Sequence, residues 1–171
     1  DFRGATEYPL FGIYGATGSG KTTILDAISY ALFGESSGAE RTGEGMRSHF
    51  VGPETESYVE LLFETGGRRY LLRRSPRQEV ARKRGEGTTD RKPEAFLFDA
   101  TAIDPEEVTF PGNCGTSLVE RKVTEVSEKV EEIVGFKAAQ FRQVVLLPQG
   151  RFRELLSAGS SERSEILRRL F

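Results

Sequence analysis

The spacing of hydrophobic and polar positions along the 171 residues predicts alternating strands and helices. An apolar run at residues 10–14 indicates a strand. Residues 23–33 carry apolar side chains at helical spacing, and Gly34 is a typical residue for ending such a helix. The apolar stripe is broad enough for burial against a sheet, and it leaves Asp26 and Ser29 on the expected solvent side.

Residues 58–75 predict a β-hairpin, because two alternating segments flank a two-residue turn at Gly66 and Gly67. With these glycines as the loop, apolar residues oppose one another on one face and opposite charges on the other. The predicted pairs are Phe63 with Tyr70, Leu61 with Leu72, Glu64 with Arg69, and Glu60 with Arg73.

The rest of the chain continues the alternation. A short continuous apolar run predicts a buried strand at residues 95–98, and valines at spacings of three and four predict a helix over residues 116–134 that ends at Gly135. Three further elements are expected: a short helix over 137–143, a buried strand over 144–147, and a helix over 161–171.

The strongest motif lies between the first predicted strand and helix. Residues 15–22 read Gly-Ala-Thr-Gly-Ser-Gly-Lys-Thr, the pattern of a phosphate-binding P-loop, in the strand–loop–helix context that the motif requires. Backbone N–H groups of such a loop surround phosphate oxygens, the lysine reaches the β- and γ-phosphates, and the threonine hydroxyl binds Mg²⁺. We therefore predict binding of ATP and Mg²⁺. The predicted contacts are Gly15, Ala16, Thr17, Gly18, Ser19, Gly20, Lys21, Thr22 and Thr23, with Thr22 on the metal.

Composition and charge narrow the picture. The chain is 37% hydrophobic and 29% charged, typical of a globular protein, and no apolar run approaches the roughly 20 residues of a membrane helix. A single cysteine, Cys114, excludes an internal disulfide and favours the cytoplasm. The net charge is −2, but the charges are unevenly distributed along the chain. The segment from Arg68 to Lys92 contains ten Lys and Arg residues and only three Asp and Glu residues.

This basic segment has two interpretations. A solvated charged loop is one, and a sequence-independent contact with the backbone of double-stranded DNA is the other. The segment lacks interleaved aromatic residues, so base stacking is not expected. The candidate DNA contacts are Arg77, Arg82, Lys83, Arg84, Arg91 and Lys92.

The segment Leu-Pro-Gln-Gly at residues 147–150 adds a resemblance. Together with the P-loop and its continuation Thr-Ile-Leu-Asp-Ala-Ile, it resembles the N-terminal half of the ATPase head in the SbcC family, relatives of the structural-maintenance-of-chromosomes ATPases. Gly-Glu-Gly-Met-Arg-Ser at residues 43–48 is also similar. The resemblance covers residues 1–171 with the exception of 101–114, which do not match clearly.

The resemblance implies an α/β fold: the N-terminal lobe of an ABC-type P-loop ATPase, with a mixed sheet, a basic hairpin region at residues 57–99 and flanking helices. It implies that Gln149, in a Q-loop at 148–150, senses Mg²⁺ and the γ-phosphate and acts in catalysis with Lys21. Residues 161–171 would begin a helix leading to a coiled coil.

The same resemblance implies partners. The signature motif, the Walker B carboxylates and a switch histidine of the family are absent, so we expect half of a head that is incomplete without a C-terminal half. Two heads would dimerise on Mg·ATP and control an SbcD-type nuclease at DNA ends, with no membrane involved.

Two other functions remain open from the residues alone. Phe96-Leu97-Phe98-Asp99 resembles a Walker B strand, so a self-contained P-loop kinase or NTPase could use Asp99 for Mg²⁺. Alternatively, a DNA-binding module could use the P-loop for structural anions only. Appreciable turnover by the chain alone distinguishes the first, and DNA binding indifferent to ATP the second.

Overall fold

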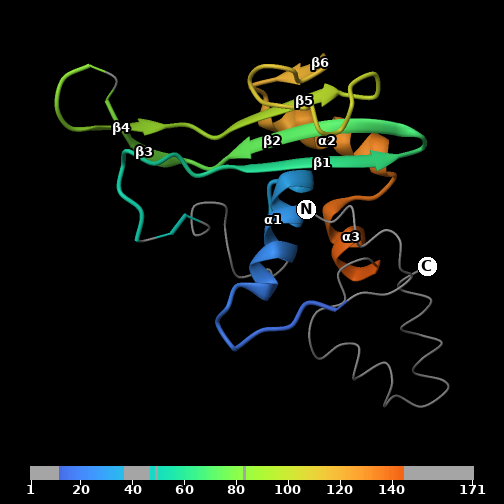
Figure 1. Ribbon diagram of the computed structural model, residues 1–171, viewed down its shortest axis with the longest axis horizontal. Coiled ribbons are helices and arrows are strands. Elements are labelled where there is room, and N and C mark those ends of the chain that lie inside the picture. Colours follow the sequence, from blue (N-terminus) through green and yellow to red (C-terminus); the bar gives the residue numbers. More distant parts are fainter. Residues whose placement is uncertain (1–11, 37–46, 49, 83, 145–171) are drawn as a thin grey trace.

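A computed structural model describes residues 12–36, 47–48, 50–82 and 84–144. At its centre is a four-stranded antiparallel sheet with the strand order β1-β2-β5-β6 (Figure 1). These strands are β1 (Val59–Thr65), β2 (Arg68–Ser75), β5 (Glu94–Asp99) and β6 (Thr116–Glu120). The helices are α1 (Lys21–Phe33), α2 (Val123–Val134) and α3 (Ala138–Val144), and a separate ladder joins β3 (Gln78–Ala81) to β4 (Thr88–Arg91).

The hairpin of β1 and β2 has the register that the sequence predicts. Phe63 pairs with Tyr70 and Leu61 with Leu72, while Glu60 and Glu64 oppose arginines on the other face. The Phe63 and Tyr70 rings lie 5.5 Å apart, and Arg73 forms an ion pair of 2.9 Å with Glu60. Side-chain patterning on both faces therefore selects one register.

One face of the sheet packs against the helices. Alternate residues of β2 and β5, among them Leu72 and Leu97, are completely buried there against α1, α2 and α3. Burying a leucine side chain stabilises a fold by roughly 2 kcal/mol. Val126 and Val130 of α2 are also fully buried, which confirms the valine stripe predicted for this helix.

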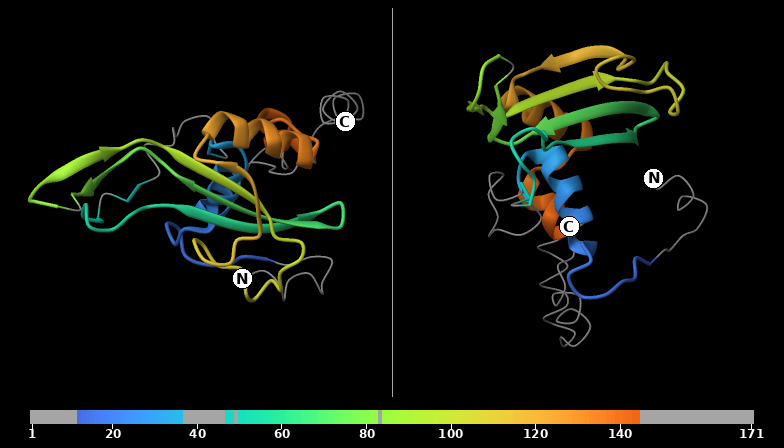
Figure 2. Two further views of the ribbon diagram at one scale, coloured as in Figure 1. Left: turned by 90° about the horizontal axis from the view of Figure 1, so that it is seen from above. Right: turned by 60° about the vertical axis from the view of Figure 1, so that its left-hand side comes forward.

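The opposite face carries a second, smaller cluster. Leu71 and Phe98 point to this side and pack with Ala100 and Cys114, and Phe110 contributes its ring from the connection between β5 and β6. Figure 2 shows this connection on the side of the sheet away from α2. Residues 101–114, which the family resemblance did not cover, thus form the cover of the outer face.

Several predicted elements are confirmed. The helix ending at Gly34 begins at Lys21, two residues earlier than predicted, and the strand at 95–98 is β5. The short helix at 137–143 is α3. The predicted helix at 161–171 and most of the predicted strand at 144–147 lie outside the described residues, while Val144 ends α3.

The prediction of a helix over residues 116–134 was wrong for its first part. Residues 116–120 form β6, which pairs with β5 through a register shift at Leu97 and Phe98. Arg121, with a φ of 62°, reverses the chain, and α2 begins after Lys122. The four-residue spacing from Val119 to Val123 suits a helix, but hydrogen bonds to a neighbouring strand decide the outcome.

Three other predictions differ from the structure. Of the predicted strand at 10–14, residues 12–14 form no strand, and residues 10 and 11 lie outside the described residues. Asp26 and Ser29 are buried, not solvent-facing, because α1 is enclosed on that side too. The basic segment contains the ladder of β3 and β4, whose apolar alternation is too weak to read among its charged residues.

Candidate nucleotide-binding site

The P-loop leads directly into the first turn of α1. Gly20, the residue preceding the helix, has a φ of 85°, a conformation that a residue with a side chain adopts only with strain. Residues 12–20 are exposed, and the first turn of α1 contains no acidic residue. The positive end of the helix dipole therefore faces solvent without a carboxylate near it in the sequence, as an anion site requires.

Lys21 points back into the loop. Its Nζ donates hydrogen bonds of 2.8 Å to the carbonyl oxygens of Gly15 and Ala16, and it lies 3.5 Å from Ser19 Oγ. Among the described ion pairs none involves Lys21, and the hydrogen-bond partners of its ammonium group among the described residues are neutral. A positive charge at the mouth of an N–H-rich loop suits a polyphosphate.

Thr22 and Thr23 are exposed on the first turn of the same helix, so both hydroxyl groups are accessible beside the loop. Over the part of the chain that the structure describes, no group of three or more His, Cys, Asp or Glu side chains could hold a metal ion. A hydroxyl group together with phosphate oxygens is the kind of ligand set that Mg²⁺ accepts without a protein carboxylate cage. The residues present therefore fit Mg·ATP.

The opposite end of α1 is held by Arg74 of β2, a residue that the sequence analysis did not single out. Its side chain is 1% exposed, and it donates through Nε to the carbonyl of Ala31 at 2.5 Å and through a terminal nitrogen to the carbonyl of Leu32 at 3.0 Å. These carbonyls belong to the last turn of the helix and lack partners within it. Arg74 thus caps α1 from the sheet.

Arg74 also reaches α2. It donates to Ser127 Oγ at 3.0 Å and lies 3.5 Å from the Val123 carbonyl. Burial lowers the pKa of the guanidinium group to about 10, so it stays charged at neutral pH. Burial likewise raises the pKa of Tyr30, an effect that the nearby Arg74 charge opposes. The sequence did contain one signal: Arg74 occupies an inward position of β2, in line with Tyr70 and Leu72.

The candidate DNA contacts lie on and around the β3–β4 ladder. Two of them are paired with acids: Arg77 with Asp90 at 2.8 Å, and Arg91 with Glu56 at 2.7 Å. The hydrogen bond from Arg77 lowers the pKa of Asp90. Formation of the ladder thus brings Asp90, one of the few acidic residues of the segment, across from β3 and into contact with Arg77.

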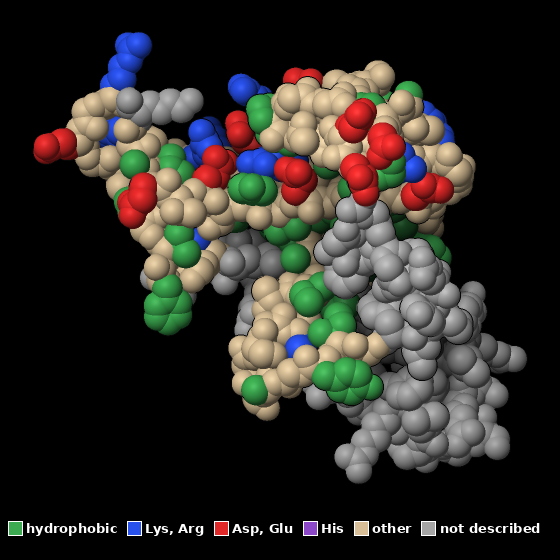
Figure 3. Space-filling model, in the orientation of Figure 1, with side chains coloured by type: hydrophobic (Ala, Val, Ile, Leu, Met, Phe, Trp, Pro, Cys, Tyr) green, Lys and Arg blue, Asp and Glu red, His purple; other side chains and the backbone are tan. Residues whose placement is uncertain are grey.

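The remaining candidate DNA contacts have no acidic partner among the described ion pairs. Arg82 donates to the Thr88 carbonyl at 3.0 Å, Arg84 and Lys92 are exposed, and Lys83 lies outside the described residues. Figure 3 shows basic and acidic side chains interleaved from this ladder along the sheet. The surface is thus a mixed one, and its positive charges without a described carboxylate partner lie at the tip and base of the ladder.

Buried polar contacts fix the ladder to the preceding loop. Gln78 is 4% exposed, and its amide exchanges two hydrogen bonds with the backbone of Ser57 at 2.8 and 2.9 Å. Arg47 donates to the carbonyls of Glu79 at 2.6 Å and Gly52 at 2.8 Å. Arg47 belongs to the segment at 43–48 that the family resemblance includes, and here it orders the start of β3.

Asp99 has other partners than a metal. Its carboxylate accepts hydrogen bonds from Arg68 and from the hydroxyl and backbone N–H of Thr101. These bonds, those from Thr101 first, lower the pKa of Asp99 to about 2. Figures 1 and 2 place the end of β5 in the sheet, at the opposite end of α1 from the P-loop. This geometry argues against Asp99 as the Mg²⁺ ligand.

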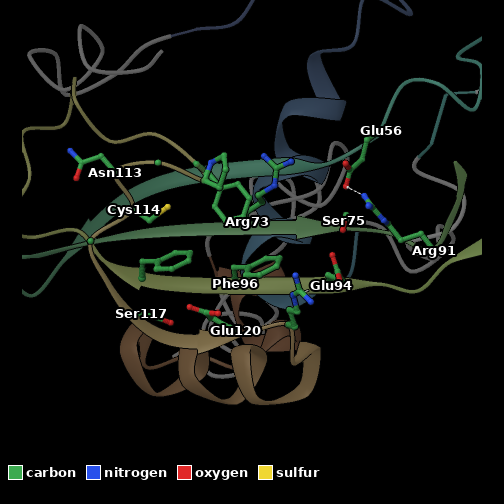
Figure 4. Close-up of a pocket in the computed structure, with 16 residues that line it drawn as sticks. Glu56, Arg73, Ser75, Arg91, Glu94, Phe96, Asn113, Cys114, Ser117 and Glu120 are labelled. Carbon is green, nitrogen blue, oxygen red and sulfur yellow. Dashed lines mark ion pairs between the residues drawn. The ribbon is translucent and has the colours of Figure 1, made fainter. Parts of the chain in front are cut away.

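A groove of about 710 Å³ lies on the outer face of the sheet. Phe96 forms part of its floor, and the ion pair of Glu56 with Arg91 lies at one end (Figure 4). The Arg73 guanidinium group is 3.5 Å from the Tyr58 ring centroid and 4.5 Å from that of Phe110. The groove is on the other side of the sheet from the helices.

Gln149, the predicted sensor of Mg²⁺ and the γ-phosphate, lies outside the described residues.

Comparison with known proteins supplies the family. A family model described as an AAA domain matches residues 1–171. Proteins named as the SbcC subunit of the SbcCD nuclease are similar over the full chain, with 46% identity in Vibrio cholerae, 35% in Lactococcus lactis and 36% in Staphylococcus aureus strain MRSA252. The chain spans 16% of the length of each of these relatives. None of the described helices is both long and apolar enough to cross a membrane.

Proposed function

Because the chain belongs to the AAA domain family, we propose that it is the ATP-binding part of an SbcC-type ATPase head. The observation that carries this proposal is the P-loop geometry. Lys21 Nζ is held at the loop by two carbonyl oxygens, at the start of a helix whose first turn has no acidic residue. An incoming polyphosphate can replace these neutral partners with stronger, charge-assisted hydrogen bonds.

The chain's own residues divide the work of binding. The N–H groups of residues 15–20 surround the phosphates, and Lys21 exchanges its carbonyl partners for β- and γ-phosphate oxygens. The Thr22 hydroxyl holds Mg²⁺, which when bound neutralises charge on the phosphates. Gln149 completes the site as the group that senses Mg²⁺ and the γ-phosphate. All of these residues bind and orient the nucleotide.

Hydrolysis needs a group that orients and deprotonates water, and we propose that a C-terminal half of the same head supplies it. A second copy of the head completes the site, so Mg·ATP joins two heads face to face. Relatives named as part of an SbcCD nuclease support an SbcD-type nuclease partner. We propose that this nuclease acts on double-stranded DNA ends and hairpins in DNA repair. This assembly works in the cytoplasm.

We assign DNA contact to the basic surface around β3 and β4. Arg82, Arg84 and Lys92 carry the charge that no described carboxylate pairs with, and Lys83 adjoins them in sequence. Arg77 and Arg91 are held by Asp90 and Glu56, so we give them a smaller share. Contacts of this kind neutralise phosphates without reading sequence.

The first experiment measures Mg·ATP affinity by calorimetry in the protein at its natural length. We expect Lys21→Ala to weaken binding about 100-fold, because a charge-assisted contact is lost. Lys122→Ala is the matched control, since this lysine lies before α2 and pairs with Glu125. Equal affinity of the Lys21→Ala protein and the unaltered protein would sink the proposal.

Two further measurements separate the finer parts. Gln149→Ala is expected to keep ATP affinity within about threefold and to lose most hydrolysis, as for a residue needed after binding.

The DNA contact is tested by salt dependence. In the double variant Arg82→Ala/Arg84→Ala, the slope of log affinity for duplex DNA against log salt concentration should become shallower by about two. The control Lys122→Ala/Lys129→Ala, whose lysines form ion pairs on α2, should leave that slope unchanged.

A further inference from the structure

Arg74 lies where the sheet and two helices meet, and we propose that it is a positioning residue for the nucleotide site. By holding the C-terminal end of α1, its guanidinium group fixes where the P-loop at the other end of the helix lies. The inference rests on the proposed function, because the P-loop must bind nucleotide for its position to matter.

The contacts of Arg74 are directional. Nε donates to the Ala31 carbonyl, and one terminal nitrogen donates to both the Leu32 carbonyl and Ser127 Oγ. No described ion pair includes Arg74, so its charge is balanced by carbonyl oxygens at the negative end of a helix. A lysine carries the same charge but cannot reproduce the planar fork. The site is thus specific for arginine.

Burial along α1 shows which end is anchored. Its buried residues are Asp26 and the continuous run from Ser29 to Phe33, whereas residues 21–25 are exposed or half-buried. The P-loop accordingly lies at the end of α1 that points away from the sheet (Figure 1). Among the described hydrogen bonds, none joins the sheet to that end of the helix, whereas Arg74 donates two to the other end.

The helix transmits this anchoring. Thirteen residues at 1.5 Å each make a rod of about 20 Å, and a tilt at its held end is carried to its free end. A change of the Arg74 contacts therefore displaces Lys21 and Thr22 relative to whatever else completes the site. Misplacement of this kind lowers binding without touching a binding residue.

The experiment compares two conservative variants in the protein at its natural length. Arg74→Lys keeps the charge and loses the fork. Arg73→Lys is the matched control, since Arg73 precedes it in β2 and faces the outer groove. We measure Mg·ATP affinity at a temperature where circular dichroism shows both to be folded. Hydrogen–deuterium exchange of peptides spanning residues 15–24, without nucleotide, reports on the P-loop.

We expect Arg74→Lys to weaken Mg·ATP binding about tenfold and to speed exchange in the P-loop peptide, with Arg73→Lys unchanged in both. Ser127→Ala removes one of the two contacts of Arg74 with α2 and leaves the contact with the Val123 carbonyl, so it should keep affinity within about twofold. Where Arg74→Lys does not fold, Arg74→Gln, which keeps two N–H donors, takes its place.

Unchanged affinity and unchanged P-loop exchange in folded Arg74→Lys would overturn the inference. So would equal effects of Arg74→Lys and Arg73→Lys. If the unaltered protein fails to bind Mg·ATP, the proposed function fails, whereas the exchange measurement without nucleotide still decides whether Arg74 controls the P-loop.

Discussion

The two ends of α1 are built in opposite ways. At the C-terminal end, Gly34 closes the helix with a hydrogen bond of 2.8 Å to the Tyr30 carbonyl, and Arg74 caps the neighbouring carbonyls inside the core. At the N-terminal end, the loop is exposed, and Lys21 bonds only to its own loop among the described contacts. The fold therefore secures the helix from the end remote from the ligand.

This difference has a physical logic. A loop that binds phosphate must keep its N–H groups unpaired and accessible, so it cannot also be the part that fixes the helix. Rigid support has to come from elsewhere, and here it comes from a buried cation that complements the negative end of the helix dipole. Five substitutions, four in or beside the helix and one at Arg74 of β2, test this division.

The largest effect is expected at the anchored end. Arg74→Met keeps most of the apolar contact but leaves the Ala31 and Leu32 carbonyls buried without partners, which should cost about 3 kcal/mol of unfolding free energy. For a domain of this size that corresponds to a fall in melting temperature of roughly 6–12 °C. Differential scanning calorimetry measures it, and a fall below about 2 °C would show that the cap is dispensable.

The second largest effect is expected at the N-terminal end of α1, next to the P-loop. Thr22→Ala removes the hydroxyl proposed to bind Mg²⁺ and should weaken ATP binding about tenfold with Mg²⁺ but hardly without it. Because Thr22 is exposed, the melting temperature should not change. Calorimetric titrations with Mg²⁺ and with EDTA make the comparison, and Thr23→Ser, which retains a hydroxyl, is the control. Equal losses in both titrations would contradict the assignment.

The two glycines that flank α1 give a closer comparison. Gly20 and Gly34 have φ angles of 85° and 77°, so alanine is strained at either position by roughly 1 kcal/mol. At Gly34 the new Cβ would also lie 3.4 Å from a terminal nitrogen of Arg74. We expect Gly34→Ala to lower the melting temperature and Gly20→Ala to weaken ATP binding instead. The reverse pattern would refute the division between the two ends.

The smallest effect is expected in the middle of the helix. Ser29 is fully buried, and its hydroxyl has no hydrogen-bond partner within the described residues. Ser29→Ala removes this unsatisfied group and should leave stability unchanged or raise it by up to about 1 kcal/mol. Urea denaturation detects such a change. A clear loss of stability would mean that the hydroxyl has a structural role.

The sequence predicted local features well. The P-loop, the end of α1 at Gly34 and the complete register of the β1–β2 hairpin follow from short-range patterns, and the structure confirms the last two. The register of the hairpin could be predicted because charged and apolar residues alternate along both of its strands. The resemblance to SbcC rested on motifs alone, and the AAA domain match over residues 1–171 and the similarity to SbcC subunits over the full chain agree with it.

Long-range features were beyond the sequence. The helical spacing of Val119 and Val123 spans a strand and a helix, and only pairing with β5 separates them. Asp90 becomes the partner of Arg77 only after β3 and β4 pair. Arg74 looks like one more basic residue of a charged segment until the fold brings Ala31 and Ser127 to it.

The single cysteine of the sequence offers a practical use of the outer cover. Cys114 is 8% exposed, its thiol lies 3.3 Å from the Thr109 carbonyl, and burial raises its pKa, all of which slow alkylation. Cys114 also lines the groove on the outer face, and lifting of the segment 101–114 would expose its thiol further. The rate at which a maleimide reacts with Cys114 therefore reports on how often this face opens. Because these 171 residues contain no other thiol, the measurement on this chain needs no engineered residue.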